Sequence, residues 1–184
     1  GADCTGEAWP VPAAEPAINK SGRWWKRESA AELFVDRLRA NDPKVQSLCV
    51  VPTMACEEAD VVAICEALAQ NTCCRELIAS GHKLSLAGCE RLAELLRSNQ
   101  QLQKFSVGDS TLGAQSCVLF QGLAQNTSIN DLDLEHKGLT AEAGRALAGA
   151  LAQRGALGAP LMKCLRLSRN PLLRESLAEL ASQA

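Results

Sequence analysis

A single phrase recurs along this chain and constrains the fold more than any other feature. The phrase is a set of apolar residues at fixed offsets, and its copies begin at Val45, Cys74, Leu102, Ile129 and Met162. Successive copies start 29, 28, 27 and 33 residues apart. A repeat of this period predicts that the chain folds as a stack of similar units, each covering the apolar face of the next.

Each copy of the phrase combines two kinds of periodicity. It opens with alternating apolar residues, as in Leu132-Asp133-Leu134, which predicts a short strand with two side chains on one face. Before the next copy the spacing becomes helical, as in Leu92, Leu95 and Leu96, and several helical stretches end in a polar stop such as Arg97-Ser98-Asn99-Gln100. Because parallel strands need a crossover between them, we predict an α/β solenoid with a parallel inner sheet and outer helices.

The chain divides into two parts by composition. Residues 1–27 are rich in Pro and Ala, lack periodicity and contain all three tryptophans, so they are predicted to form an extended tail. Residues 28–184 are predicted to form the repeat domain, with a capping helix at 28–41 and about five repeats over 45–184. A final helix is expected at 173–180, and a Gly/Ala/Pro loop at 155–160 is expected to protrude.

These repeats resemble the ribonuclease-inhibitor-like class of leucine-rich repeats, a type also found in NOD-like receptors. The segments Leu123 to Leu134 and Leu92 to Val107 carry the resemblance best. It implies a right-handed horseshoe segment that binds proteins through its concave inner face. In that class an Asn bonds the backbone of neighbouring turns as a ladder. Asn170 lies at this position here, and the other copies have Thr53, His82, Ser110 and Lys137 at the matching positions.

The outward strand positions define the side chains of the concave face. Three columns are expected across the strands: Ser47, Glu76, Lys104, Asp131, Cys164; then Cys49, Ile78, Ser106, Asp133, Arg166; then Val51, Ser80, Gly108, Glu135, Ser168. We expect Glu76, Lys104 and Asp131 to form an alternating charge ladder, and Asp133 to face Arg166.

Two interpretations of this charged region stay open. Its members can be structural cross-strand pairs, or Asp131, Asp133 and Glu135 can form an acidic patch for a basic partner. At the other end of the face, Cys49, Val51 and Ile78 are predicted to bind a partner segment or the protein's own tail.

The tail itself contains a second set of candidate contact residues. Trp9, Trp24, Trp25, Lys26 and Arg27 combine aromatic and basic side chains, which suits contact with a protein partner. The alternatives are that Trp24 and Trp25 close the first core layer of the solenoid, or that the tail contacts a membrane surface or nucleic acid.

Composition and spacing exclude several other classes of protein. The net charge of −2 provides no general attraction for nucleic acid, and no apolar run is long enough to span a membrane. The nine cysteines include no CxxC pair and several lie in apolar stretches, so we expect free thiols in a reducing intracellular compartment, cytoplasmic or, after removal of a presequence, organellar. His82 and His136 lie on separate repeats without a nucleophile at a fixed spacing. We therefore expect no enzyme activity, cofactor or metal.

Two functions remain in contention. The first is an adaptor or regulatory module that binds a protein through the concave face and the tail. The second is a structural accessory subunit, built permanently into a larger multiprotein assembly, in an organelle or elsewhere in the cell, and anchored by the tail.

Overall fold

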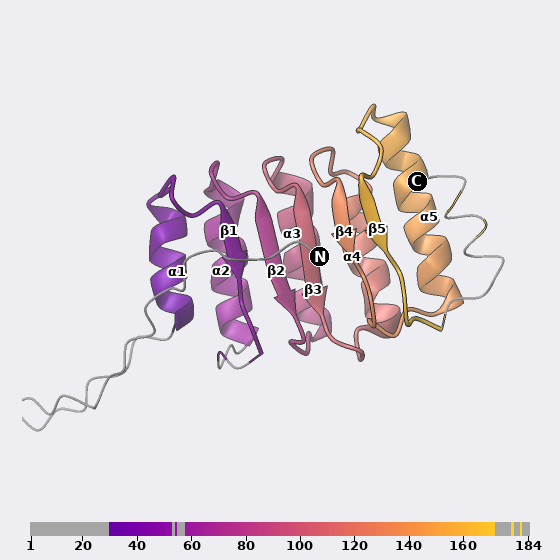
Figure 1. Ribbon diagram of the computed structural model, residues 1–184, viewed down its shortest axis with the longest axis horizontal. Coiled ribbons are helices and arrows are strands. Elements are labelled where there is room, and N and C mark those ends of the chain that lie inside the picture. Colours follow the sequence, from indigo (N-terminus) through magenta and orange to yellow (C-terminus); the bar gives the residue numbers. More distant parts are fainter. Residues whose placement is uncertain (1–29, 53, 55–57, 172–177, 179–180, 182–184) are drawn as a thin grey trace, which may run out of the picture.

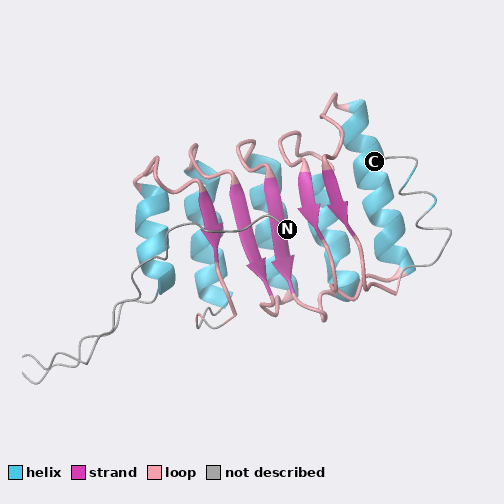
Figure 2. Ribbon diagram, viewed as in Figure 1, coloured by secondary structure: helices cyan, strands magenta, loops and turns pink. Residues whose placement is uncertain are grey.

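The computed structural model describes residues 30–52, 54, 58–171, 178 and 181 of the chain. Its strands form one layer and its helices a second layer behind them (Figures 1 and 2). The strands are β1 Ser47–Cys49, β2 Glu76–Ser80, β3 Lys104–Gly108, β4 Asp131–Asp133 and β5 Cys164–Arg166. The helices are α1 Ala30–Arg39, α2 Glu58–Gln70, α3 Leu86–Ser98, α4 Ser116–Leu123 and α5 Ala141–Ala156, with a 3₁₀ turn, η1, at Gly113–Gln115.

The strand pairing confirms the solenoid. All five described strands pair in parallel in the order β1-β2-β3-β4-β5, with a helix between each pair of neighbours in sequence. The register matches the predicted columns, because Ser47 pairs with Glu76, Glu76 with Lys104 and Lys104 with Asp131. No crossover skips a strand, so each described unit packs on its sequence neighbours.

One continuous apolar core lies between the two layers. The second residues of the first four strands are at most 2% exposed: Leu48, Leu77, Phe105 and Leu132. They pack against helix residues such as Leu68, Leu96 and Leu123, which are equally buried. Each such side chain contributes roughly 1.5–3 kcal/mol by leaving water. A slip of one residue would turn the strand's apolar side chains to solvent, which explains why the register follows the sequence pattern so closely.

Some element boundaries differ from the prediction. The capping helix expected at 28–41 ends at Arg39 and is followed by a turn; its described part begins at Ala30, and residues 28 and 29 lie outside the described residues. Helix α5 continues to Ala156, so the loop expected at 155–160 begins after Ala156: adding a residue to an existing helix is favourable, and the helix extends through Gly155. The predicted tail at 1–27 and most of the expected final helix at 173–180 lie outside the described residues.

A ladder of buried asparagines joins the turns where the helices end. Asn99 is 3% exposed; its Nδ2 donates to Leu68 O at 2.6 Å, in the preceding unit. Its Oδ1 accepts from the backbone N–H groups of Gln101 and Leu102 at 2.8 and 2.9 Å. Asn71 and Asn126 make the corresponding bonds in their own units. The polar stops noted in the sequence are therefore buried connectors between units, which the sequence analysis did not recognise.

Arg154 extends this ladder in the unit that ends with α5. The side chain is 2% exposed, and its guanidinium donates to Ile129 O and, at 3.4 Å, to Asn126 Oδ1. Burial lowers the pKa of Arg154 from its usual value. An arginine thus takes over the linking role that asparagine has in the earlier turns.

Candidate functional site

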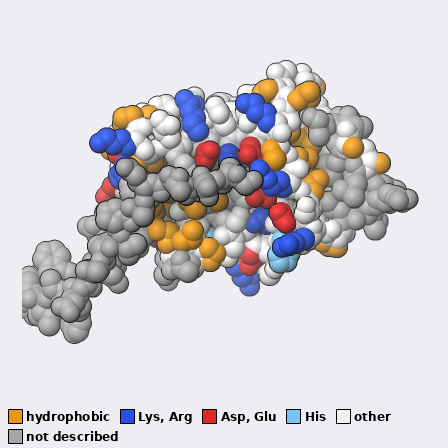
Figure 3. Space-filling view, in the orientation of Figure 1, with side chains coloured by type: hydrophobic (Ala, Val, Ile, Leu, Met, Phe, Trp, Pro, Cys, Tyr) orange, Lys and Arg blue, Asp and Glu red, His pale blue; other side chains and the backbone are white. Residues whose placement is uncertain are grey.

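The face of the sheet turned away from the helices, here called the sheet face, is the predicted concave face. Figure 2 shows the described helices on the opposite side of the strands only. Side chains from all five strands therefore gather on one surface. Figure 3 looks onto this face and shows two regions along it: apolar side chains over the lower parts of β1 and β2, and charged side chains over β3 to β5 and at the start of β2.

The apolar region consists of three predicted contact residues. Cys49 and Ile78 are paired in register on β1 and β2, and Val51 follows β1. Cys49 is exposed, Val51 is 41% exposed and Ile78 is half-buried. The structure thus brings Cys49, Val51 and Ile78 onto two neighbouring strands, where they form an accessible apolar strip.

The charged region is only in part the predicted ladder. Asp131 lies between Lys104 and Cys164 in register, as expected, but its carboxylate accepts a hydrogen bond from Arg166 Nη1 at 2.8 Å. Asp133, the predicted partner of Arg166, is opposite it in register and is not its ion-pair partner. The long arginine side chain reaches diagonally past its direct neighbour. The Asp131 carboxylate raises the pKa of Arg166 further.

The remaining acidic residues are also held by neighbours. Asp133 Oδ1 accepts from the backbone N–H of Glu135 at 3.0 Å. Glu135 lies 3.6 Å from Arg169 Nε, a residue that the sequence analysis did not select. Within the described part of the chain, Lys104 forms no ion pair within 4.0 Å. Glu76, Lys104 and Asp131 therefore lie side by side in register, as expected, but no salt bridge joins them. The region is a mosaic of both charges.

A buried lysine lies under the edge of this face. Lys137 is 4% exposed, and its Nζ donates to Gly108 O at 2.7 Å and to Ser80 Oγ at 3.1 Å. Ser80 in turn shares a hydrogen bond with Ser106. Burial lowers the pKa of the Lys137 ammonium, against the opposing influence of Asp133 and Asp109. Its charge alone would have predicted exposure.

Three comparisons place this arrangement among known proteins. No protein-family model matches the chain. The ribonuclease inhibitor of Sus scrofa is 32% identical over 126 residues, which cover 67% of this chain and 26% of that protein. The structure titled "Leiomodin-1 Actin-Binding Site 2 (ABS2)" matches with a TM-score of 0.61 at 16% identity. The match covers 84% of this chain and 89% of that chain.

A second solved structure, the tropomodulin C-terminal domain of Caenorhabditis elegans, has a TM-score of 0.66 at 13% identity. It covers 84% of this chain and 90% of its own. This chain has the leucine-rich repeat fold and is similar in sequence to ribonuclease inhibitor. It spans about a quarter of the length of the curated relative.

In the loops that follow the strands, side chains at the position that holds Asn in leucine-rich repeats bond to the neighbouring loop. Asn170 Oδ1 accepts from the N–H groups of Lys137 and Leu139, and its Nδ2 donates to Leu134 O at 2.7 Å. His82, at the matching position, contacts Val50 O through Nε2 at 3.0 Å. Lys137 reaches Gly108 O in the same way. Three different residue types thus link neighbouring loops at this position: Asn170, Lys137 and His82. Ser110 makes no side-chain hydrogen bond within the described residues, and Thr53 lies outside them.

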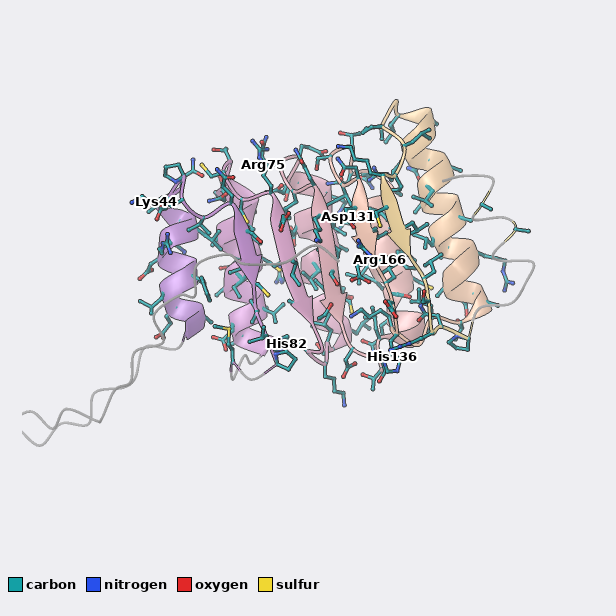
Figure 4. The ribbon with its side chains drawn as sticks, in the orientation of Figure 1. Lys44, Arg75, His82, Asp131, His136 and Arg166 are labelled. Atoms are coloured by element: carbon teal, nitrogen blue, oxygen red, sulfur yellow. The ribbon has the colours of Figure 1, made fainter. Side chains whose placement is uncertain are left out.

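The described residues contain little that suggests chemistry. No group of three or more His, Cys, Asp or Glu side chains in this part of the chain could hold a metal ion. His82 is occupied in the loop ladder, and His136 takes a backbone φ of 54° in its turn (Figure 4). No helix in the described ranges is long and apolar enough to cross a membrane. The tail candidates Trp9, Trp24, Trp25, Lys26 and Arg27 lie outside the described residues.

Proposed function

We propose that this leucine-rich repeat is a protein-binding module that recognises its partner through the sheet face. The observation that carries the proposal is the exposed strip of Cys49, Val51 and Ile78 beside a charged mosaic, on a surface that no described helix covers. An apolar anchor next to charged residues is the composition of many protein interfaces. Two of the similar proteins are named for binding a protein: an inhibitor of ribonuclease and an actin-binding site.

Within this proposal the two regions have different roles. The apolar strip supplies the affinity, since burying it removes accessible apolar surface from water. The mosaic of Lys104, Asp131, Asp133, Glu135 and Arg166 supplies orientation and specificity. Because Arg166 and Arg169 already accompany Asp131 and Glu135, we favour the structural cross-strand interpretation over a simple acidic patch.

Substitution in the apolar strip tests the role of the sheet face. Val51→Lys places a charge in the strip, and Leu86→Lys is a matched control because Leu86 is 52% exposed at the start of α3. We expect Val51→Lys to abolish capture of the partner from an extract and Leu86→Lys to leave it unchanged, with both proteins folded by circular dichroism. Equal capture by the wild type and Val51→Lys would reject the proposal.

A double charge reversal separates the two interpretations of the mosaic. Asp131→Lys with Asp133→Lys removes the Arg166 contact, so a structural role predicts a lower melting temperature and a recognition role predicts weaker capture at low salt with little change in melting. We expect a lower melting temperature together with weaker capture, because Asp131 holds Arg166 and the mosaic also orients the partner; weaker capture with unchanged melting would indicate a simple acidic patch.

Deletion of residues 1–27 tests the tail. If the tail is part of the binding site or an anchor, the truncated protein will fold but lose its partner. Full retention of the partner would restrict binding to the repeat domain.

A further inference from the structure

The edge of the solenoid where the strands begin has a charge unlike that of the whole chain. We define the strand-start edge as the last two residues of each described helix together with the turn that follows: 38–46, 69–75, 97–103, 122–130 and 155–163. Its cationic side chains in these ranges are Arg39, Lys44, Arg75, Arg97 and Lys163. The acidic side chain in the same ranges is Asp42, whose carboxylate is paired with Arg37 at 2.9 Å. This edge is therefore strongly cationic, although the chain carries a net charge of −2.

The backbone aligns part of this edge into a regular row. The row consists of Gln46, Arg75, Gln103, Asn130 and Lys163, and each residue after Gln46 donates its backbone N–H to the carbonyl of the one before it, at 2.7 to 2.9 Å. The row thus continues the parallel sheet by one residue beyond the strands. Three strand spacings of about 4.8 Å separate Arg75 from Lys163, which puts them about 14 Å apart. The amide side chains of Gln103 and Asn130 belong to the two positions between them.

The Arg75 side chain has a fixed direction at this edge. Its Nη1 donates to the carbonyl and the side chain of Gln101, which fixes the direction of the guanidinium. The other two guanidinium nitrogens, Nε and Nη2, make no hydrogen bond within the described residues. Figure 4 shows Lys44 and Arg75 at the edge where the strands begin, away from His82 and His136 at the opposite edge.

An exposed apolar group lies at one end of the same edge. Leu157 and Leu161, in the turn between α5 and β5, are 56% and 76% exposed. Leu161 precedes Lys163 by two residues, so a leucine and a cation are presented together. The helix dipole accounts for cations at helix ends such as Arg39 and Arg97. It accounts neither for Lys163 and Arg75 outside the helices nor for the two exposed leucines.

We propose that the strand-start edge binds an acidic, extended segment of a partner protein. An extended chain rises about 3.3 Å per residue, so two carboxylates about four residues apart would reach Arg75 and Lys163. An apolar side chain just beyond the second carboxylate would cover Leu161 and Leu157. The described turns contain no aromatic side chain on which a nucleic-acid base could stack, which favours a protein segment over a single-stranded nucleic acid. This surface is separate from the sheet face.

A labelled peptide tests the proposal with the full chain. The probe has two Asp residues four positions apart, followed by Leu; matched probes carry Asn for both Asp, or Ser for Leu. Binding is measured by fluorescence anisotropy at low and at moderate salt. We expect the acidic peptide to bind, the Asn peptide to bind about tenfold more weakly or less, and the affinity to fall with salt.

Variants locate the site. Arg75→Glu with Lys163→Glu should weaken binding about tenfold or more, and Lys163→Glu alone, which disturbs no side-chain hydrogen bond in the described structure, should weaken it in the same direction. The matched control is Lys83→Glu with Arg145→Glu, which changes the net charge equally and lies off the edge. Equal weakening by the control would show a general charge effect and overturn the proposal.

Two further comparisons complete the test. Tighter binding of oligo-dT or of phosphatidylserine vesicles than of the acidic peptide would identify a different class of ligand and overturn the proposal. Val51→Lys should leave peptide binding unchanged, so the outcome at this edge is independent of the outcome at the sheet face.

Discussion

Replacement of Asn99, a member of the buried asparagine ladder, should lower the stability of the protein. Truncation by Asn99→Ala removes a donor from Leu68 O and an acceptor from the N–H groups of Gln101 and Leu102. Three hydrogen bonds are lost around a residue that is 3% exposed: the two N–H groups are left without a partner, and Leu68 O keeps only its bond from the Asn71 N–H at 3.1 Å. At about 1 kcal/mol for each, we expect the free energy of unfolding to fall by about 3 kcal/mol. For a chain of this size that corresponds to a melting temperature lower by about 6–12 °C.

The measurement is urea unfolding followed by circular dichroism, with Asn130→Ala as the control. Asn130 is half-buried in the neighbouring turn, and its side chain makes no hydrogen bond within the described residues. Its removal should change the free energy of unfolding by less than about 0.5 kcal/mol. If Asn99→Ala and Asn130→Ala have the same stability, the ladder does not hold the units together and the reasoning is wrong.

Three more predictions concern packing and titration. A Cβ at Gly122 would lie 2.6 Å from Ala93 Cα, so Gly122→Ala should lower the melting temperature. A Cβ at Gly149 would have no atom within 4 Å, so Gly149→Ala should raise the melting temperature by improving helix propensity. A change of the same sign in both variants would contradict the close approach of α3 and α4. Burial raises the pKa of the Cys65 thiol to about 12, above the unfolded value of 9.0, so the stability that it contributes is complete below pH 9 and is lost above it. Between pH 7 and 10, under reducing conditions, the free energy of unfolding of the wild type should fall by about 1 kcal/mol relative to that of Cys65→Ala. A difference in unfolding free energy between the two proteins that does not change with pH would contradict the burial of the thiol. The lowered pKa of Lys137 has the opposite consequence, because the unfolded chain holds the proton to higher pH. As the pH rises toward 10.5, the wild type should gain stability relative to Lys137→Met in urea unfolding. A loss of relative stability would contradict the burial of the Lys137 ammonium.

The strand register could be predicted residue by residue from the sequence. The period of two places Leu48, Leu77, Phe105 and Leu132 on one side, and only one register buries all of them together. The exposed columns follow from the same alternation. The apolar strip of the sheet face was therefore predictable, as was its position beside the charged region.

The polar connections could not be predicted in the same way. Asn99 was recognised as a helix stop, because its partners in the preceding unit come from the stacking of turns and not from local sequence. Lys137 and Arg154 carry charges that ordinarily predict exposure, yet both are buried against backbone carbonyls. The diagonal contact of Arg166 with Asp131 depends on side-chain length and direction, which a column of residue types does not specify.

Photo-crosslinking from the sheet face tests the proposed function most directly. Benzoylphenylalanine is introduced at Cys49, exposed on β1, and separately at Arg145, exposed on the outer helix α5. Irradiation of the full chain with its native extract should produce a discrete protein adduct from position 49 and none from position 145, and Val51→Lys should remove the adduct. Adducts from position 145 alone would contradict recognition through the sheet face.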